Sequence, residues 1–412
     1  MEKLQGKKPQ VRFPEFKEAW EHKQLSELLT EAKKRNGDLK YGKDEVLSVS
    51  GELGIVNQIE HLGRSYAGVS VHQYHVVEVS DIVYTKSPLK ANPYGIIKLN
   101  KRKAGIVSTL YAVYTVNKKA ACGEFIEHYF SLGANTNRYL RPLVKKGAKN
   151  DMKISNAYVL HDRIFVPAVT EQKRIAAFFT VLDKKIELLK QMKELLEEYK
   201  KGVMQKIYSQ KLRFYDSKGK GFPKWEKKKL GEVAKISSGG TPSRAKSEYW
   251  DGDIPWISTS LVDFNIILKA EEYITAEGVE NSSAKLYPKG TLLMAMYGQG
   301  KTRGKVALLD IEATTNQACA AILPNPDKLD NVFLFQNLSN RYEEIRNISN
   351  AGGQQNLSGQ LLKSLPVEFP SLQEQNKIID FLNAIDIKIN LATKQIENIQ
   401  QYKKGLLQNM FI

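Results

Sequence analysis

The sequence predicts an α+β fold in which two strand-rich mixed domains are joined by two long helices that form an antiparallel coiled coil. Three observations support this fold class. Residues 166–208 align without a gap on residues 369–411, with 15 of 43 positions identical, which is a pseudo-twofold internal repeat. Both repeats carry apolar residues at every seventh position, as coiled-coil helices do. The remaining segments are rich in short β-branched runs punctuated by Gly, Pro and Asn, a pattern typical of strands and turns.

These observations divide the chain into four parts. We expect a first domain at residues 1–165, a first repeated helix at 166–208, a second domain at 209–365 and a second repeated helix at 366–412. The length of 412 residues suffices for two domains that each have a core. Hydrophobic residues at 42% and charged residues at 26% are globular values, which exclude wholesale disorder and a collagen-like chain.

The two domains are predicted to be strand-rich but differ in sequence. Short apolar runs predict strands at residues 76–79, 81–84 and 106–108 of the first domain and at 254–257, 291–294 and 305–309 of the second. Only the openings are alike, because Arg12 and Trp20 of the first domain recur as Arg213 and Trp225 in the second. The repeated unit is therefore a globular domain followed by a helix.

The repeated helices each carry one apolar stripe. Its seventh-position residues are Ile175, Leu182, Leu189, Leu196 and Val203 in the first copy and Ile378, Ile385, Ala392, Ile399 and Leu406 in the second. A helix of about 38 residues would be about 57 Å long and must bury such a stripe. The other copy is the nearest partner, and the intervening domain favours an antiparallel pair. Ser371 and Glu374 have the spacing of a capping box, and Glu171 would favour the dipole of the first helix.

The two cysteines and the lack of long apolar runs indicate the cellular compartment of the protein. Cys122 and Cys319 lie far apart and form no CxxC motif, which is typical of reduced thiols in a cytosolic protein. The first eight residues lack the apolar stretch of a signal peptide, and no run of 18 apolar residues predicts a membrane span. We therefore expect a cytoplasmic protein.

The formal net charge of +17 favours a polyanionic partner. Nucleic acid is the leading class, ahead of an anionic membrane surface, and most of the excess charge lies in residues 1–169. Basic residues with few nearby acids are candidates for contacts to phosphates. In the first domain these are Lys98, Lys101, Arg102, Lys103, Lys118, Lys119, Lys145 and Lys146.

A glycine-rich loop in the second domain is a candidate for contacts to bases. Glycine lets a backbone approach a phosphate closely, while Gln suits adenine and Arg suits guanine. The loop offers Gln299, Lys301, Arg303 and Lys305, and a second amide cluster contains Gln354 and Gln355. Arg303 is predicted to reach a base edge and Lys305 to meet phosphate.

Signals for catalysis and for metal binding are weak. The segment that ends in Gly300 and Lys301 lacks the first glycine of a Walker A loop, since Ala295 stands there. Asn92-Pro93-Tyr94 lacks one proline of the Asn-Pro-Pro-Tyr motif of amino-methyltransferases and is interpreted as a turn. His72 and His75 on a strand would point to opposite faces, which disfavours a zinc site. We predict no catalytic and no metal-binding residues.

The arrangement of domains and helices resembles the specificity subunit of a type I restriction-modification system. Both repeated helices begin with Pro-x-x-x-Glu-Gln-x-x-Ile, at Pro167 and at Pro370, and each follows a variable domain. The opening from Trp225 to Val233 and the stretch from Gly290 to Ala321 are also similar to target-recognition domains of this family. The first domain departs from that opening, because Ser26 stands where the second has Gly231.

The resemblance implies a subunit without an active site, and hence not an enzyme. Each domain would be a target-recognition domain that reads one half of a bipartite double-stranded DNA target, and the spacer helices would set the gap between the halves. Methyltransferase (modification) subunits that carry S-adenosylmethionine and restriction/translocase subunits that use ATP and Mg would dock on this chain. No cofactor is expected in the chain itself.

Two other functional classes stay open. The first is a DNA methyltransferase-like enzyme, which is disfavoured because no glycine-rich cofactor loop precedes Asn92. The second is a non-catalytic coiled-coil scaffold that binds only proteins, which the charge of +17 disfavours.

Overall fold

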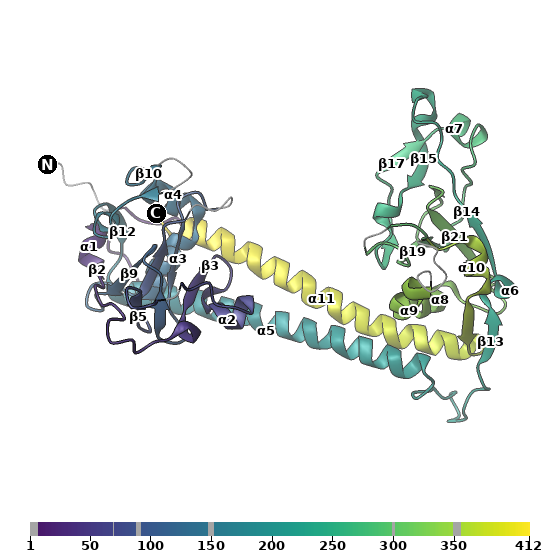
Figure 1. Cartoon of the computed structure of the whole chain (residues 1–412), viewed down its shortest axis with the longest axis horizontal. Coiled ribbons are helices and arrows are strands. Elements are labelled where there is room, and N and C mark those ends of the chain that lie inside the picture. Colours follow the sequence, from purple (N-terminus) through teal and green to yellow (C-terminus); the bar gives the residue numbers. More distant parts are fainter. Residues whose placement is uncertain (1–6, 69, 88–91, 147–151, 299–300, 349–355) are drawn as a thin grey trace. The chain divides into compact units, whose positions relative to one another are not determined.

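The computed structural model describes residues 7–68, 70–87, 92–146, 152–298, 301–348 and 356–412. The chain divides into two compact units, Met1–Lys190 with Lys394–Ile412 and Gln191–Thr393. Two long helices, α5 (Val169–Tyr208) and α11 (Leu372–Met410), contribute one segment each to both units (Figure 1). Each unit therefore contains one globular domain and a pair of helix segments.

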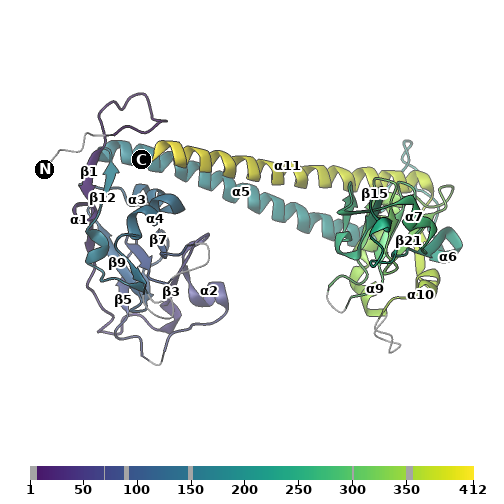
Figure 2. The same ribbon diagram turned by 90° about the horizontal axis from the view of Figure 1, so that it is seen from above.

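The first unit is built on a four-stranded sheet with the order β2-β9-β6-β7. Its elements are β1 (Glu21–Gln24), α1 (Leu25–Leu28), β2 (Leu29–Glu31), β3 (Leu47–Ser50), β4 (Gly54–Asn57), α2 (Gln58–Leu62), β5 (His75–Val77), β6 (Ile82–Thr85), β7 (Ile96–Leu99), β8 (Gly105–Val107), β9 (Tyr111–Val116), α3 (Gly123–Ser131), α4 (Gly133–Leu140), β10 (Lys145–Lys146), β11 (Met152–Lys153) and β12 (Arg163–Val166). Helix α3 packs on β7, and α4 follows it directly (Figure 2). The main core lies between this sheet and these helices, around Tyr84, Tyr114 and Phe125.

The second unit is built on a five-stranded sheet with the order β14-β21-β18-β19-β16. Its elements are β13 (Glu226–Lys229), α6 (Leu230–Val233), β14 (Ala234–Ser238), β15 (Trp250–Ile257), β16 (Asn265–Ile267), β17 (Glu272–Ile274), α7 (Ala276–Glu280), β18 (Leu292–Ala295), β19 (Val306–Leu309), β20 (Thr314–Thr315), β21 (Cys319–Pro324), α8 (Asn331–Asn340), α9 (Tyr342–Ile348), α10 (Gly359–Ser364) and β22 (Pro366–Phe369). A three-stranded sheet, β17-β15-β20, extends the domain. The runs predicted as strands in both domains form β5, β6, β8, β15, β18 and β19, so the strand-rich α+β class is confirmed.

The internal repeat extends into the domains, although their sequences hardly show it. The order β2-β9-β6-β7 in the first unit matches β14-β21-β18-β19 in the second. In each case a four-residue helix, α1 or α6, leads into the edge strand. In each domain a two-stranded ribbon also pairs the first strand with the last, β1 with β12 and β13 with β22. The last strand of each ribbon leads directly into a long helix.

The helix segments of each unit run antiparallel, because the start of one helix packs with the end of the other. In the first unit Phe179 of α5 contacts Phe411 after α11, and Asp183 forms an ion pair with Lys403. In the second unit Lys200 of α5 pairs with Asp386 of α11 at 2.5 Å. All ten seventh-position residues of the predicted stripe are buried or half-buried, which confirms the coiled-coil seam.

Glu171 and Glu374, at the starts of the two long helices, each bind an arginine from the opening of the same domain. The Glu171 carboxylate accepts hydrogen bonds from Arg12 Nε and Nη2, both at 2.7 Å. Glu374 accepts from Arg213 Nε at 2.8 Å and Nη2 at 2.7 Å. The predicted capping box at Ser371 is therefore wrong, because among the described residues the Glu374 carboxylate accepts from Arg213 and not from the Ser371 amide.

The glutamine that follows each of these glutamates joins the helix start to a loop of the domain. Gln172 donates to the carbonyls of Pro167 and Ala120 and accepts from the Cys122 amide. Gln375 donates to the carbonyls of Pro370 and Lys328 and accepts from the Asp330 amide. The repeated Glu-Gln pair thus fixes each long helix to its own domain.

Removal of Arg213 tests the contribution of this contact to stability. In Arg213→Met the Glu374 carboxylate, whose side chain is 0% exposed, would lose its bidentate partner. We expect the free energy of unfolding of the second unit to fall by about 3–5 kcal/mol in urea denaturation. Lys227→Met breaks the exposed ion pair with Glu368 and should cost less than about 1 kcal/mol. Equal losses in the two variants would contradict the assignment.

His128 of α3 is a buried histidine beside the helix pair. Its ring lies 5.1 Å from that of Phe179, and its side chain is almost fully enclosed. Burial, and then the charges of Lys403, Lys101 and Lys98, lower the pKa of His128 to about 3. The imidazole is therefore neutral in the folded protein, whereas an unfolded chain binds a proton below about pH 6.5.

This difference predicts a loss of stability in acid. Because the pKa is lower in the folded state, the His128 contribution is complete above about pH 6.5 and declines as the pH falls toward 3. His128→Leu should remove about 3 kcal/mol from the decline in unfolding free energy between pH 7 and pH 4. His61→Leu, at an exposed position, serves as the control. Stability curves for His128→Leu and the unaltered chain that fall in parallel would show the prediction to be wrong.

Candidate nucleic-acid interface

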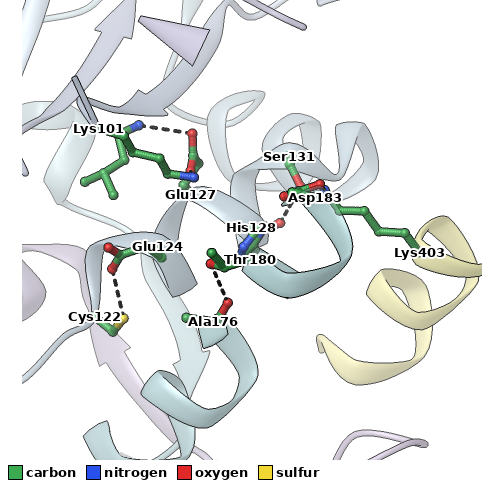
Figure 3. A network of polar contacts seen from close by, with 11 residues as sticks. Lys101, Cys122, Glu124, Glu127, His128, Ser131, Ala176, Thr180, Asp183 and Lys403 are labelled. Atoms are coloured by element: carbon green, nitrogen blue, oxygen red, sulfur yellow. Dashed lines mark hydrogen bonds and ion pairs between the residues drawn. The ribbon is translucent and has the colours of Figure 1, made fainter. Parts of the chain in front are cut away.

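Four of the predicted basic residues form one group along β7 and the loop that follows it. Lys98 lies on β7, and Lys101, Arg102 and Lys103 lie in the connection to β8. Lys101 pairs with Glu127 of α3 at 2.5 Å, and Figure 3 shows this contact near the Lys403–Asp183 pair. Lys103 lies 3.7 Å from Glu60, and Arg102 is exposed. Two of these four cationic side chains, Lys101 and Lys103, are thus partly neutralised by nearby acids.

The other basic candidates of the first domain lie on separate loops. Lys118 and Lys119 are exposed in the turn between β9 and α3. Lys145 is exposed on β10, and Lys146 lies beside it on the same strand, its side chain outside the described residues. The structure therefore places Lys118, Lys119 and Lys145 on the surface, on loops and a strand other than β7.

The glycine-rich loop of the second domain connects β18 to β19, as the sequence predicted. Lys301 is exposed, whereas Arg303 is only 8% exposed and donates to the carbonyl of Arg346 at 3.4 Å. Lys305 forms an ion pair with Asp263 at 2.5 Å. Gln299, Gln354 and Gln355 lie outside the described residues. Lys301 is thus the described cation of this loop that faces solvent most openly.

The first domain has an equivalent loop that the sequence did not reveal. Residues 86–95 connect β6 to β7, and residues 296–305 connect β18 to β19. Each loop has a glycine with positive φ at or next to its end, 87° at Gly95 and 86° at Gly304. A Cβ at Gly95 would lie 2.0 Å from the carbonyl oxygen of Thr85, so only glycine fits. The predicted turn at Asn92-Pro93-Tyr94 is confirmed and belongs to this loop.

A hollow of about 980 Å³ opens beside the second-domain loop. Polar side chains line it, among them Ser237, Ser238, Gln317 and Lys363, together with the ring of Tyr297. The hydroxyl of Thr241 donates to Gln317 Oε1 at 2.5 Å, which leaves the amide hydrogens of Gln317 available to a ligand.

The equivalent place in the first domain carries different chemistry. By strand register, Glu31 and Lys86 correspond to Ile236 and Met296 of the hollow. Lys86 donates to Asn156 Oδ1 at 3.0 Å, and Asn156 donates to Glu31 at 3.0 Å. Matching positions of similar sheets thus carry charged side chains in the first domain and apolar side chains in the second. Sequence inspection missed Lys86 and Asn156 because only the strand register aligns the two domains.

The described residues also bear on metal binding and membrane insertion. Within them, no three His, Cys, Asp or Glu side chains gather closely enough to hold a metal ion. None of the helices in the described ranges combines the length with the apolar character that a membrane span requires.

Comparison with known proteins gives matches to specificity subunits of type I restriction enzymes. The family model of the type I restriction modification DNA specificity domain matches residues 223–401. The MjaIX specificity subunit of Methanocaldococcus jannaschii, a type I restriction enzyme subunit, is 32% identical over 193 residues, which are 46% of this chain and 44% of that protein. The EcoR124I/EcoR124II specificity subunit of Escherichia coli is 33% identical over 175 residues, or 41% and 43% of the two chains. The chain thus matches less than half the length of each of these relatives.

Two solved structures share the fold over almost the whole chain. The type I restriction-modification S subunit from M. genitalium has a TM-score of 0.58 at 14% identity and covers 98% of this chain and 99% of its own. A chain from a structural study of assembly and conformational transition in the type I restriction-modification system has a TM-score of 0.58 at 16% identity, covering 95% and 97%. The resemblance predicted from the helix repeats is therefore confirmed: residues 223–401 match the type I restriction modification DNA specificity domain, and the chain is similar to specificity subunits of type I restriction-modification systems.

Proposed function

We propose that this chain is the subunit of a type I restriction-modification complex that reads a bipartite DNA target. Each domain reads one half of the target, and the α5–α11 pair sets the number of unread base pairs between the halves. The chain performs no chemistry itself. Methyltransferase subunits with S-adenosylmethionine and restriction/translocase subunits with ATP and Mg act on the DNA that it selects, in the cytoplasm.

The main support for the proposal is that the two domains share one architecture but differ in surface residues. Both domains share a sheet order, a terminal ribbon and an arginine–glutamate contact to a long helix. They differ at equivalent places of the sheet. The first domain has the hydrogen-bonded group Glu31, Asn156 and Lys86 there, whereas the second has the hollow beside Tyr297. A shared scaffold with unlike surfaces suits two readers of unlike DNA sequences.

The charge of the chain supports DNA as the ligand. The net charge of +17 favours a polyanion, and the exposed cations Arg102, Lys118, Lys119, Lys145 and Lys301 are available for phosphate contacts. Lys101, Lys103 and Lys305 would first have to leave their acidic partners. We therefore rank the exposed group above the paired group as contacts to DNA.

Exposed apolar side chains on the helix segments support docking of partner subunits. In the second unit Met192, Leu195 and Tyr199 of α5 are 44%, 65% and 54% exposed. Ile387 and Leu391 of α11 are 59% and 54% exposed. Their spacing of three and four residues places each set on one helix face, which is the pattern that a partner helix covers.

An insertion into α5 tests the spacing role. Four residues inserted after Glu194 add about one helical turn and about 6 Å of rise. In a host that supplies the partner subunits, we expect the methylated motif to gain about two unread base pairs, with both halves unchanged. The measurement is a genome-wide map of methylated bases. The same insertion at Ser217, in the exposed connection between α5 and β13, should leave the gap unchanged. A gap that keeps its length after the α5 insertion would refute the spacing role.

Exchange of one domain tests whether the two domains read independently. Replacement of residues 1–165 by the matching segment of a relative should alter one half of the methylated motif and leave the other intact. Helix α5 begins at Val169, so the exchange keeps the whole helix pair. The same methylation map provides the readout, and changes in both halves would argue against separate reading.

A further inference from the structure

A second hollow lies in the first unit, where the end of α11 passes β7 and α4. Its volume is about 630 Å³. Three lysines line it: Lys98 from β7 and Lys403 and Lys404 from α11. Glu52 is the acidic side chain on its wall. The lining therefore has an excess of positive charge.

Lys98 is the unusual member of this group. It is partly buried, and within the described residues its ammonium group makes no hydrogen bond or ion pair. The two nearby carboxylates are used by other lysines, since Glu127 binds Lys101 and Asp183 binds Lys403 (Figure 3). Burial is the main cause that lowers the pKa of Lys98. A partly buried ammonium without a counter-ion is costly, and an anion in the hollow would relieve that cost.

The amino end of α4 faces the same hollow. Gly133, Ala134 and Asn135 are the first three residues of this eight-residue helix, and all three line the hollow. The first amides of a helix have no acceptor within the helix, and no side chain caps α4 at Leu132. Backbone amides and the helix dipole favour a bound anion at this end. The amides and the lysines come from separate elements and converge on one space.

We propose that this hollow is a phosphate-binding site formed by Lys98, Lys403, Lys404 and the amino end of α4. A phosphate group offers several acceptor oxygens, which match the ammonium groups of Lys98 and Lys404 and a set of backbone amides, while Lys403 adds positive charge next to its partner Asp183. Under the proposed function its source is the DNA backbone; a free phosphate or a nucleotide is the other source of the same group. Only the choice of DNA as source rests on the proposed function.

Two variants at different residues test the site, so that the test still stands if one of them fails to fold. Ala134→Glu places a carboxylate at the exposed amino end of α4, which the helix dipole tolerates, and should compete with phosphate. Ala134→Gln is its uncharged control. Lys98→Met removes the unpaired ammonium, and Lys17→Met removes an equal charge from an exposed position of the same unit. Calorimetric titration of the full chain with inorganic phosphate at constant ionic strength is the measurement.

We expect the unaltered chain to bind phosphate, and Ala134→Glu and Lys98→Met to bind it about tenfold more weakly. The two controls should bind as the unaltered chain does. In phosphate-free chloride buffer, Lys98→Met should also melt at a higher temperature than the unaltered chain, since the unpaired charge is gone. Equal phosphate binding by all five proteins, or displacement of phosphate by acetate at equal concentration, would overturn the proposal.

Binding of duplex DNA distinguishes the two sources. If the DNA backbone supplies the phosphate, Ala134→Glu should lower the slope of log affinity against log salt by about one unit relative to Ala134→Gln. If the slopes are equal while inorganic phosphate binding is weakened, the site takes free phosphate or a nucleotide. Failure of the proposed function would give a different result. The map of methylated bases would then be the same in a host with the unaltered chain and in a host without it.

Discussion

Each long helix is held to its domain by an arginine–glutamate contact with a buried glutamate. The arrangement of domain and helix in both repeated units depends on this contact. Arg12 reaches Glu171 across 159 residues, and Arg213 reaches Glu374 across 161. A buried carboxylate without its arginine partner would raise the free energy of the folded state. The folded domain is therefore stable only when the arginine of its opening contacts the glutamate at the helix start. The ring contacts Phe13–Phe178 and Phe214–Phe381 lie beside these pairs and add apolar packing to the same junction. The junction therefore fixes where each helix begins.

Much of the fold could be predicted because the helices repeat without a gap. The seventh-position stripe identified both long helices, and their antiparallel pairing followed from the domain between them. Arg12, Trp20, Glu171 and Gln172 were each visible as repeated residues, but their contacts were not. Sequence distance hides such contacts, since the two ends of a domain meet only after folding, through the ribbons β1–β12 and β13–β22 among other contacts. Local rules assigned Glu374 to a helix cap instead.

The candidate interface could be predicted less well, for a different physical reason. A sequence shows where lysines occur but not which carboxylates face them. Lys101 and Lys305 looked equivalent to Lys118 and Lys301, yet the first two are paired and the other two face solvent. Likewise, Arg303 was predicted to face a base, while the fold buries most of its side chain against the backbone of Arg346. The similarity of the β6–β7 and β18–β19 loops appears only when strand register aligns them.

The terminal ribbons also have a consequence for how such proteins diversify. Neighbouring strands lie about 4.8 Å apart, so the points where a chain enters and leaves each domain are almost adjacent. A segment whose ends meet at that spacing can be spliced between the ribbon strands, provided that it keeps the loop contacts to Gln172 or Gln375. Recombination at these two points would replace a whole domain surface in one step, whereas point mutation would have to rebuild a surface residue by residue. The ribbon therefore gives each domain closely spaced ends, which is the geometry that exchange of a whole domain requires.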